Sequence, residues 1–173
     1  NVCSSDLSIV ANSVTGHNIG VPVYSTLALG PDVIAASESL DEIIDEAIAW
    51  PTDGVYVVVR HPNSDRFLIA DDVFLYNLLS ALLSLERAGK NVILGYANQQ
   101  MLVAAAVGIH GLATGNFRNV RQFNPDMFRP DGSEPRSRAV WYYDSISLSE
   151  FRTNALALAY RRGMDDLFTS SSP

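Results

Sequence analysis

The chain has 173 residues, of which 47% are hydrophobic and 18% charged, a composition typical of one globular domain with a buried core. No apolar run approaches the ~18 residues that a membrane-spanning helix needs. The formal net charge of −7 gives no reason to expect nucleic acid or an anionic membrane as a partner, because the overall field repels both. We therefore expect a cytoplasmic protein whose oligomeric state the composition leaves open.

The first residues read as an artefact rather than as natural protein. Residues 2–7 translate back to GTG TGC TCT TCC GAT CT, the end of a widely used sequencing adapter, so we expect residues 1–7 to be an adapter scar and the native N-terminus to lie elsewhere. The single cysteine, Cys3, falls in that scar, which excludes thiolate catalysis and cysteine-based metal sites within the fragment. Residues 8–169 are expected to form one truncated α/β domain, with a disordered tail at 170–173.

Short β-branched or apolar runs alternate along the chain with patterns of helical spacing. The runs predict strands at Val21–Leu29, Val55–Val59, Asn91–Gly95, Gly111–Gly115 and Arg138–Tyr142. The intervening patterns predict helices that end at Ala49 and Ala88, a helix over Gln99–Val107, and a terminal helix over Leu148–Arg162.

Capping residues set the expected helix ends. Capping boxes at Ser39–Glu42 and Ser147–Glu150 predict the starts of the first and last helices. The second helix is expected to begin at Asp71 or Asp72 and to stop at Gly89. In the third, Asn98 is the predicted N-cap and Gly108 the stop.

Strands separated by helices require a parallel sheet with right-handed crossovers. The segment Ala106–Gly115, a helix that ends in glycine before a Gly-x-x-x-Gly strand, resembles the late units of phosphate-binding (β/α)8 barrels. We therefore expect the C-terminal portion of a TIM-like barrel. The alternative is a flavodoxin-like open parallel sheet, which would also fit this length.

In either fold the ligand site lies beyond the carboxyl ends of the strands. The segments that follow the predicted strands are rich in amides, aromatic rings and arginine, which suit an anionic small molecule or a planar polar ligand. The ligand-binding candidates are Asn63, Tyr96, Asn98, Gly115, Asn116, Arg118, Asn119 and Tyr143.

His61 and Asp144 are the candidate catalytic residues. His61 follows a buried strand and ordinarily titrates near neutrality, as a general base should. The alternative is a structural histidine whose ring satisfies a loop carbonyl before Pro62. Asp144, beyond the last predicted strand, would supply an acid. The three histidines lack the spacing of metal ligands, so no metal site is expected, and the sequence names no cofactor.

As a whole the chain resembles bacterial barrel proteins without an assigned activity. More locally, Gly95–Asn98, Ala106–Ile109 and Phe117–Arg121 are similar in layout to late units of the tRNA-guanine transglycosylases. That family places its nucleophilic aspartate where this chain has Ala113–Thr114, and its zinc-binding cysteines are absent here. The resemblance therefore implies a barrel without the family's chemistry.

Two functions remain open at this point. The first is a barrel that binds an anionic or nucleobase-like small ligand at the carboxyl rim of its strands, with or without catalysis. The second is a non-catalytic barrel that acts as an interaction module, which the scarcity of lysine, cysteine and paired carboxylates favours.

Overall fold

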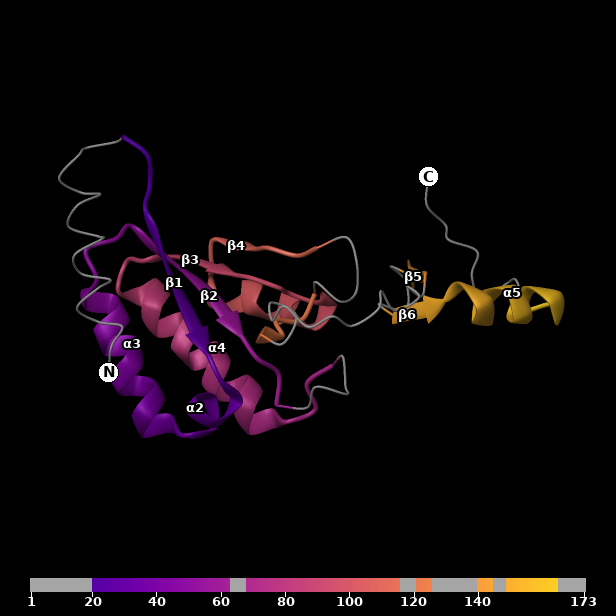
Figure 1. Cartoon of the computed structure of the whole chain (residues 1–173), viewed down its shortest axis with the longest axis horizontal. Coiled ribbons are helices and arrows are strands. Elements are labelled where there is room, and N and C mark those ends of the chain that lie inside the picture. The colour runs from indigo at the N-terminus through magenta and orange to yellow at the C-terminus, as the bar shows by residue number, and fades with distance from the viewer. Residues whose placement is uncertain (1–19, 63–67, 116–120, 126–139, 145–148, 165–173) are drawn as a thin grey trace, which may run out of the picture. The chain divides into compact units, whose positions relative to one another are not determined.

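The structure is a computed structural model that describes residues 20–62, 68–115, 121–125, 140–144 and 149–164. Its contacts divide the chain into two compact units, Asn1–Arg129 and Pro130–Pro173. Figure 1 traces both units.

The first unit is a mixed α/β fold built on a parallel sheet. Its strands are β1 (Tyr24–Leu29), β2 (Gly54–Val59), β3 (Asn91–Leu94) and β4 (Gly111–Leu112), and they pair in chain order, β1-β2-β3-β4. Its helices are α2 (Pro31–Ala35), α3 (Ser37–Ala49), α4 (Asp72–Arg87) and the 3-10 helix η1 (Gln99–Val107). The predicted parallel pairing of these strands is confirmed. Runs of strands in chain order occur both in barrels and in open doubly wound sheets.

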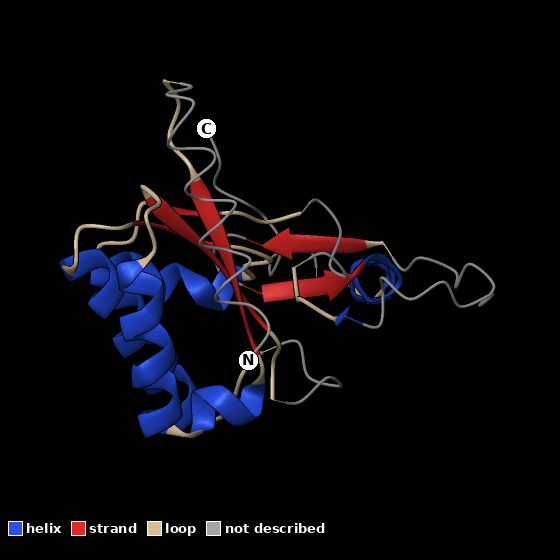
Figure 2. Cartoon of the chain, turned by 60° about the vertical axis from the view of Figure 1, so that its left-hand side comes forward, coloured by secondary structure: helices blue, strands red, loops and turns tan. Residues whose placement is uncertain are grey.

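One face of this sheet carries the core. In β1 the side chains of Ser25, Leu27 and Leu29 are buried while those of Tyr24, Thr26 and Ala28 are exposed. The register places Leu27 beside Val57 and Val57 beside Leu94, so the buried face continues across the sheet. Helices α2, α3 and α4 supply the apolar side chains that pack on it, and they lie together on one side of the strands in Figure 2. The core residues from these helices are Ile34, Leu40, Ile44, Ala47, Phe74, Leu78, Ala81, Leu82 and Leu85.

On the opposite face, tyrosine rings cover glycines of the neighbouring strand. The Tyr24 ring lies where a side chain at Gly54 would stand, and the Tyr56 ring does the same at Gly95. A Cβ atom at either glycine would collide with the ring, so both positions require glycine because of this close approach. Burial, with a smaller contribution from nearby Tyr96, raises the pKa of the Tyr56 phenol.

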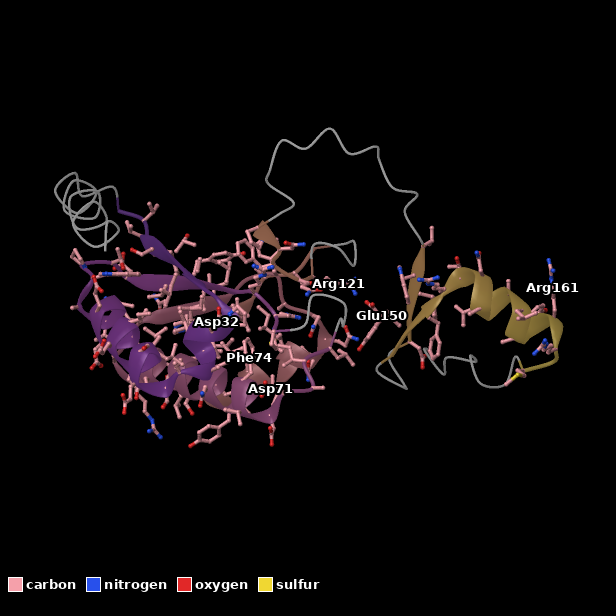
Figure 3. The ribbon with its side chains drawn as sticks, turned by 60° about the horizontal axis from the view of Figure 1, so that its bottom comes forward. Asp32, Asp71, Phe74, Arg121, Glu150 and Arg161 are labelled. Carbon is pink, nitrogen blue, oxygen red and sulfur yellow. The ribbon has the colours of Figure 1, made fainter. Side chains whose placement is uncertain are left out.

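The predicted caps of α4 and η1 are confirmed. The Asp71 carboxylate accepts a hydrogen bond of 3.0 Å from the Phe74 amide (Figure 3), and the Asn98 side chain accepts from the amides of Gln100 and Met101. Gly89 and Gly108 have φ angles of +83° and +81°, the left-handed conformation that glycine adopts after a helix. The helical residues of η1 follow the predicted bounds, but the helix is 3-10 rather than α.

The start of α3 differs from the prediction. The helix begins at Ser37, with Ala36 as its N-cap, and Ser39 lies inside the first turn. The Leu40 amide donates to the Ala36 carbonyl at 3.0 Å, which starts the helical ladder before the predicted capping box. The short helix α2 precedes it directly and was not predicted; a proline in its first turn favours helix initiation there.

In the second unit β5 (Trp141–Asp144) pairs antiparallel with β6 (Ser149–Arg152), and α5 (Thr153–Arg161) follows. The expectation that the last strand, over Arg138–Tyr142, belongs to a parallel sheet is therefore wrong, as is the helix start at Ser147–Glu150. The four residues between β5 and β6 suit a hairpin and are too few for a parallel crossover. The hairpin also sets Trp141 opposite Arg152, whose guanidinium carbon lies 5.2 Å from the centre of the Trp141 ring.

Among the described helices, none combines the length and the apolar character that crossing a bilayer requires.

Candidate ligand-binding site

Polar and aromatic residues lie where β2, β3 and β4 end, an area we call the carboxyl edge and define by Arg60, His61, Tyr96, Gln99, Gly115 and Phe123. Beyond the end of β2, the Arg60 amide donates to the Leu29 carbonyl at 3.0 Å, and Arg60 forms an isolated parallel bridge with Phe123. The Phe123 ring meets the Tyr96 ring edge to face, with 5.3 Å between the ring centres. A segment distant in sequence is therefore held against the ends of both β2 and β3.

Hydrogen bonds also join the ends of β3 and β4. The Ala113 amide donates to the Leu94 carbonyl at 2.9 Å, and the Ala97 amide donates to the Ala113 carbonyl at 3.0 Å. The Nε of Arg121 donates to the Gly115 carbonyl at 3.0 Å; Figure 3 labels Arg121 in the first unit. These bonds fix the backbone at the ends of β3 and β4 relative to each other and tie Arg121 to the residue Gly115 that follows β4.

Tyr96 has a strained backbone. Its φ of +54° makes it the sole residue other than glycine with a positive φ in the part of the chain that the structure describes. A bulky residue in this conformation costs free energy and is retained where its surroundings enforce it. Here the preceding Gly95 lies against the Tyr56 ring and the Tyr96 ring packs on Phe123. The strain therefore sits at the carboxyl edge itself.

His61 is a buried, neutral imidazole. Its side chain is 3% exposed, and its Nδ1 has no hydrogen-bond partner among the described residues. Burial lowers the pKa of His61 to about 4, because the interior disfavours the charged ring. The expectation that this ring titrates near neutrality is therefore wrong, and among the described residues Nδ1 bonds to no loop carbonyl.

Gln99 supplies a second polar atom without a partner. It is the first residue of η1, and its side-chain oxygen Oε1 is buried with no hydrogen bond within the described ranges. The register of β2 and β3 sets Val57 opposite Leu94. His61 and the N-cap Asn98 each come four residues after that pair, so His61 and the start of η1 lie at matching positions along the chain beyond two neighbouring strands.

Gln100 clamps those two loops together. Its side-chain Nε2 donates to the Ile69 carbonyl at 2.7 Å, and its Oε1 accepts from the Ile69 amide at 2.9 Å. Ile69 is buried in the loop between β2 and α4, the loop that also contains His61. One amide side chain thereby pairs with both polar groups of a backbone residue, as a neighbouring strand would.

We expect Gln100→Glu to loosen this clamp. A carboxylate cannot donate to the Ile69 carbonyl, and a broken, partly buried hydrogen bond costs about 1–2 kcal/mol. Urea unfolding should show that loss, and hydrogen exchange should show faster exchange of the Ile69 amide. Gln122→Glu makes the same chemical change outside the clamp and should leave Ile69 protected. Equal protection of Ile69 in both variants would contradict the clamp.

The structure brings some of the predicted site residues together. His61, Tyr96, Asn98 and Gly115 all lie where β2, β3 and β4 end. Asn98 is buried and its oxygen caps η1, which gives this side chain a structural role whatever else it contacts. Asn63, Asn116, Arg118 and Asn119 lie outside the described residues.

The remaining two candidates lie in the second unit. Tyr143 is 37% exposed and Asp144 is 5% exposed, and both belong to the β5–β6 hairpin.

Sequence reasoning did not select Phe123 or Gln100. No sequence spacing predicts that Phe123 pairs with Arg60 after the end of β2. Gln100 lies close to the N-cap Asn98, and an amide side chain in such a place often bonds to backbone, so its bonds to Ile69 could have been predicted.

No group of three or more histidine, cysteine, aspartate or glutamate side chains in the described ranges is placed to hold a metal ion. Comparisons with protein-family models, with curated proteins and with solved structures find no match to this chain. The resemblance to barrel proteins and to transglycosylases therefore stays a prediction.

Proposed function

We propose that the first unit binds a small polar ligand, anionic or nucleobase-like, at its carboxyl edge. The observation that carries the proposal is His61, a buried ring with an unsatisfied Nδ1 on the loop that follows β2. Leaving a buried polar atom unpaired is costly, and such atoms in native proteins commonly await a ligand, water or ion. The strained Tyr96, which follows the neighbouring strand β3, is the kind of feature that clusters at binding sites.

The proposal includes a barrel-type architecture. Helices that cover a single face of a parallel sheet, with strands in chain order, are what consecutive units of a (β/α)8 barrel present. On the other face, small residues such as Ala28 and Gly54 and the buried Val58 would suit a barrel interior. In this architecture, as in an open parallel sheet, ligands bind at the carboxyl ends of the strands.

Binding is proposed rather than catalysis. A general base works best with a pKa near the operating pH, and burial holds the pKa of His61 at about 4. At neutral pH the ring can donate one hydrogen bond and accept another, but it removes protons poorly. The role that fits this group is to orient a ligand.

The proposal is tested by titrating the full chain with inorganic phosphate and, separately, with adenine while backbone amide resonances are followed by NMR. At least one of the two should shift the amides of Gly95, Tyr96 and Gly115, with saturation, and His61→Leu should weaken that binding by roughly tenfold or more, the effect of losing one good hydrogen bond. Shifts confined to other parts of the unit, or no shift with either compound, would refute the proposal.

A further inference from the structure

Two buried polar atoms without partners mark adjacent strand ends, and the function proposed above uses only one of them. The two atoms are Nδ1 of His61, a residue that follows the end of β2, and Oε1 of Gln99, a residue that follows the end of β3. The buried Nε1 of Trp50 also lacks a partner, but Trp50 comes just before β2, at the opposite end of the strands. Among the described residues of the carboxyl edge, the unsatisfied groups are therefore these two.

The fold holds the loops of this pair together. Gln100, the neighbour of Gln99, binds both backbone groups of Ile69, which lies in the same loop as His61. On the other flank, Phe123 bridges Arg60, the neighbour of His61, and packs its ring on Tyr96. Gln100, next to Gln99, thus binds the segment after β2, and Arg60, next to His61, is linked through Phe123 to Tyr96 in the segment after β3.

We infer that Gln99 and His61 bind an uncharged carboxamide group in preference to an anion. Oε1 of Gln99 can only accept, so its partner must carry an N–H or O–H group. A carboxylate or phosphate dianion offers no such donor and would be repelled by the amide oxygen. A carboxamide supplies an N–H for Gln99 and a C=O that can accept from the imidazole, while the rings of Tyr96 and Phe123 at this edge suit an aromatic carrier.

A neutral imidazole is consistent with this choice. Burial lowers the pKa of His61 to about 4, so at neutral pH the ring brings no positive charge that would draw an anion to the pair. The inference rests on the proposed function, since it names the ligand class for that same site.

The test compares benzamide with benzoate, which share a ring and differ in the group that the pair would bind. Each is titrated into the isotope-labelled full chain at pH 7 while the His61 ring and Gln99 side-chain resonances are followed by NMR. Benzamide should shift both sets of resonances and bind at least about tenfold more tightly than benzoate, the discrimination expected when a buried acceptor is left unpaired.

Gln99→Met removes the acceptor while keeping the length of the side chain. Benzamide affinity should fall by roughly tenfold or more, and the free protein should melt at a temperature about 3 °C higher, because a buried unsatisfied oxygen is gone. A purely structural glutamine would lower the melting temperature when replaced. Asn154→Met, at an exposed position in α5, should change neither quantity.

Three outcomes overturn the inference. They are benzoate binding as tightly as benzamide at the same resonances, neither compound shifting His61, and Gln99→Met binding benzamide like the unmodified chain. The phosphate and adenine titrations decide the proposed function independently, so the site can stand as an anion site when the carboxamide preference fails.

Discussion

Replacing Phe74 with alanine is expected to lower the free energy of unfolding of the first unit by about 3–5 kcal/mol, the range measured for large aromatic truncations in cores. Phe74 is 1% exposed and belongs to the core cluster that joins α4 to the sheet. It also lies in the first turn of α4, where its amide donates to the Asp71 cap. Urea unfolding followed by helical circular dichroism measures the loss, because most described helices belong to this unit.

Tyr76→Ala is the matched control. It removes an aromatic ring from the same helix two residues later, but that ring is 72% exposed. Surface substitutions of this kind usually change stability by no more than about 0.5 kcal/mol. A similar loss in both variants would mean that the face of α4 carrying Phe74 does not pack on the sheet as described.

The contrast between Phe74 and Tyr76 also explains why the first unit was predictable. Helical spacing assigned Phe74, Leu78, Leu82 and Leu85 to one face of a helix, and these residues are buried. The continuous apolar run of β2 predicted a strand covered on both sides, and both Val57 and Val58 are buried although they point to opposite faces. Periodicity succeeds here because burial in this unit follows local pattern.

The second unit shows where such reasoning fails. Ser147–Glu150 matches a capping box, but Ser149 and Glu150 pair with β5 instead. The capping box contributes roughly a kilocalorie per mole, and cross-strand pairs such as Trp141 with Arg152 compete with it on the same scale. Two local preferences of equal size cannot be ranked from one sequence, so the hairpin was missed.

The positions of the candidate residues on the fold were predictable, whereas their surroundings were not. The strand assignments placed His61, Tyr96 and Gly115 after the carboxyl ends of β2, β3 and β4, where the structure has them, and ligand binding at these ends stays a prediction. That His61 is desolvated depends on how completely its surroundings cover it, which no spacing rule encodes. The unsatisfied oxygen of Gln99 is likewise a property of packing.

The burial of His61 predicts an acid-sensitive fold. In the folded chain the pKa of this ring is about 4 against an ordinary value of 6.5. Between these values the unfolded chain binds the proton more readily, so stability is complete above pH 6.5 and falls as the pH drops toward 4. A difference of this size corresponds to about 3 kcal/mol. Urea unfolding of the full chain at intervals from pH 7.5 to 4 should show the decline.

Two substitutions assign that decline to one ring. His61→Leu removes the titrating group and should flatten this part of the stability curve, leaving only the contribution of carboxylates at the acid end. His110→Leu is the matched control: it makes the same replacement at an exposed histidine and should leave the decline in place. NMR titration of the His61 ring supplies the direct measure. A ring that titrates near 6.5 in the folded chain would show that solvent reaches it, and the unpaired Nδ1 would then need no ligand to satisfy it.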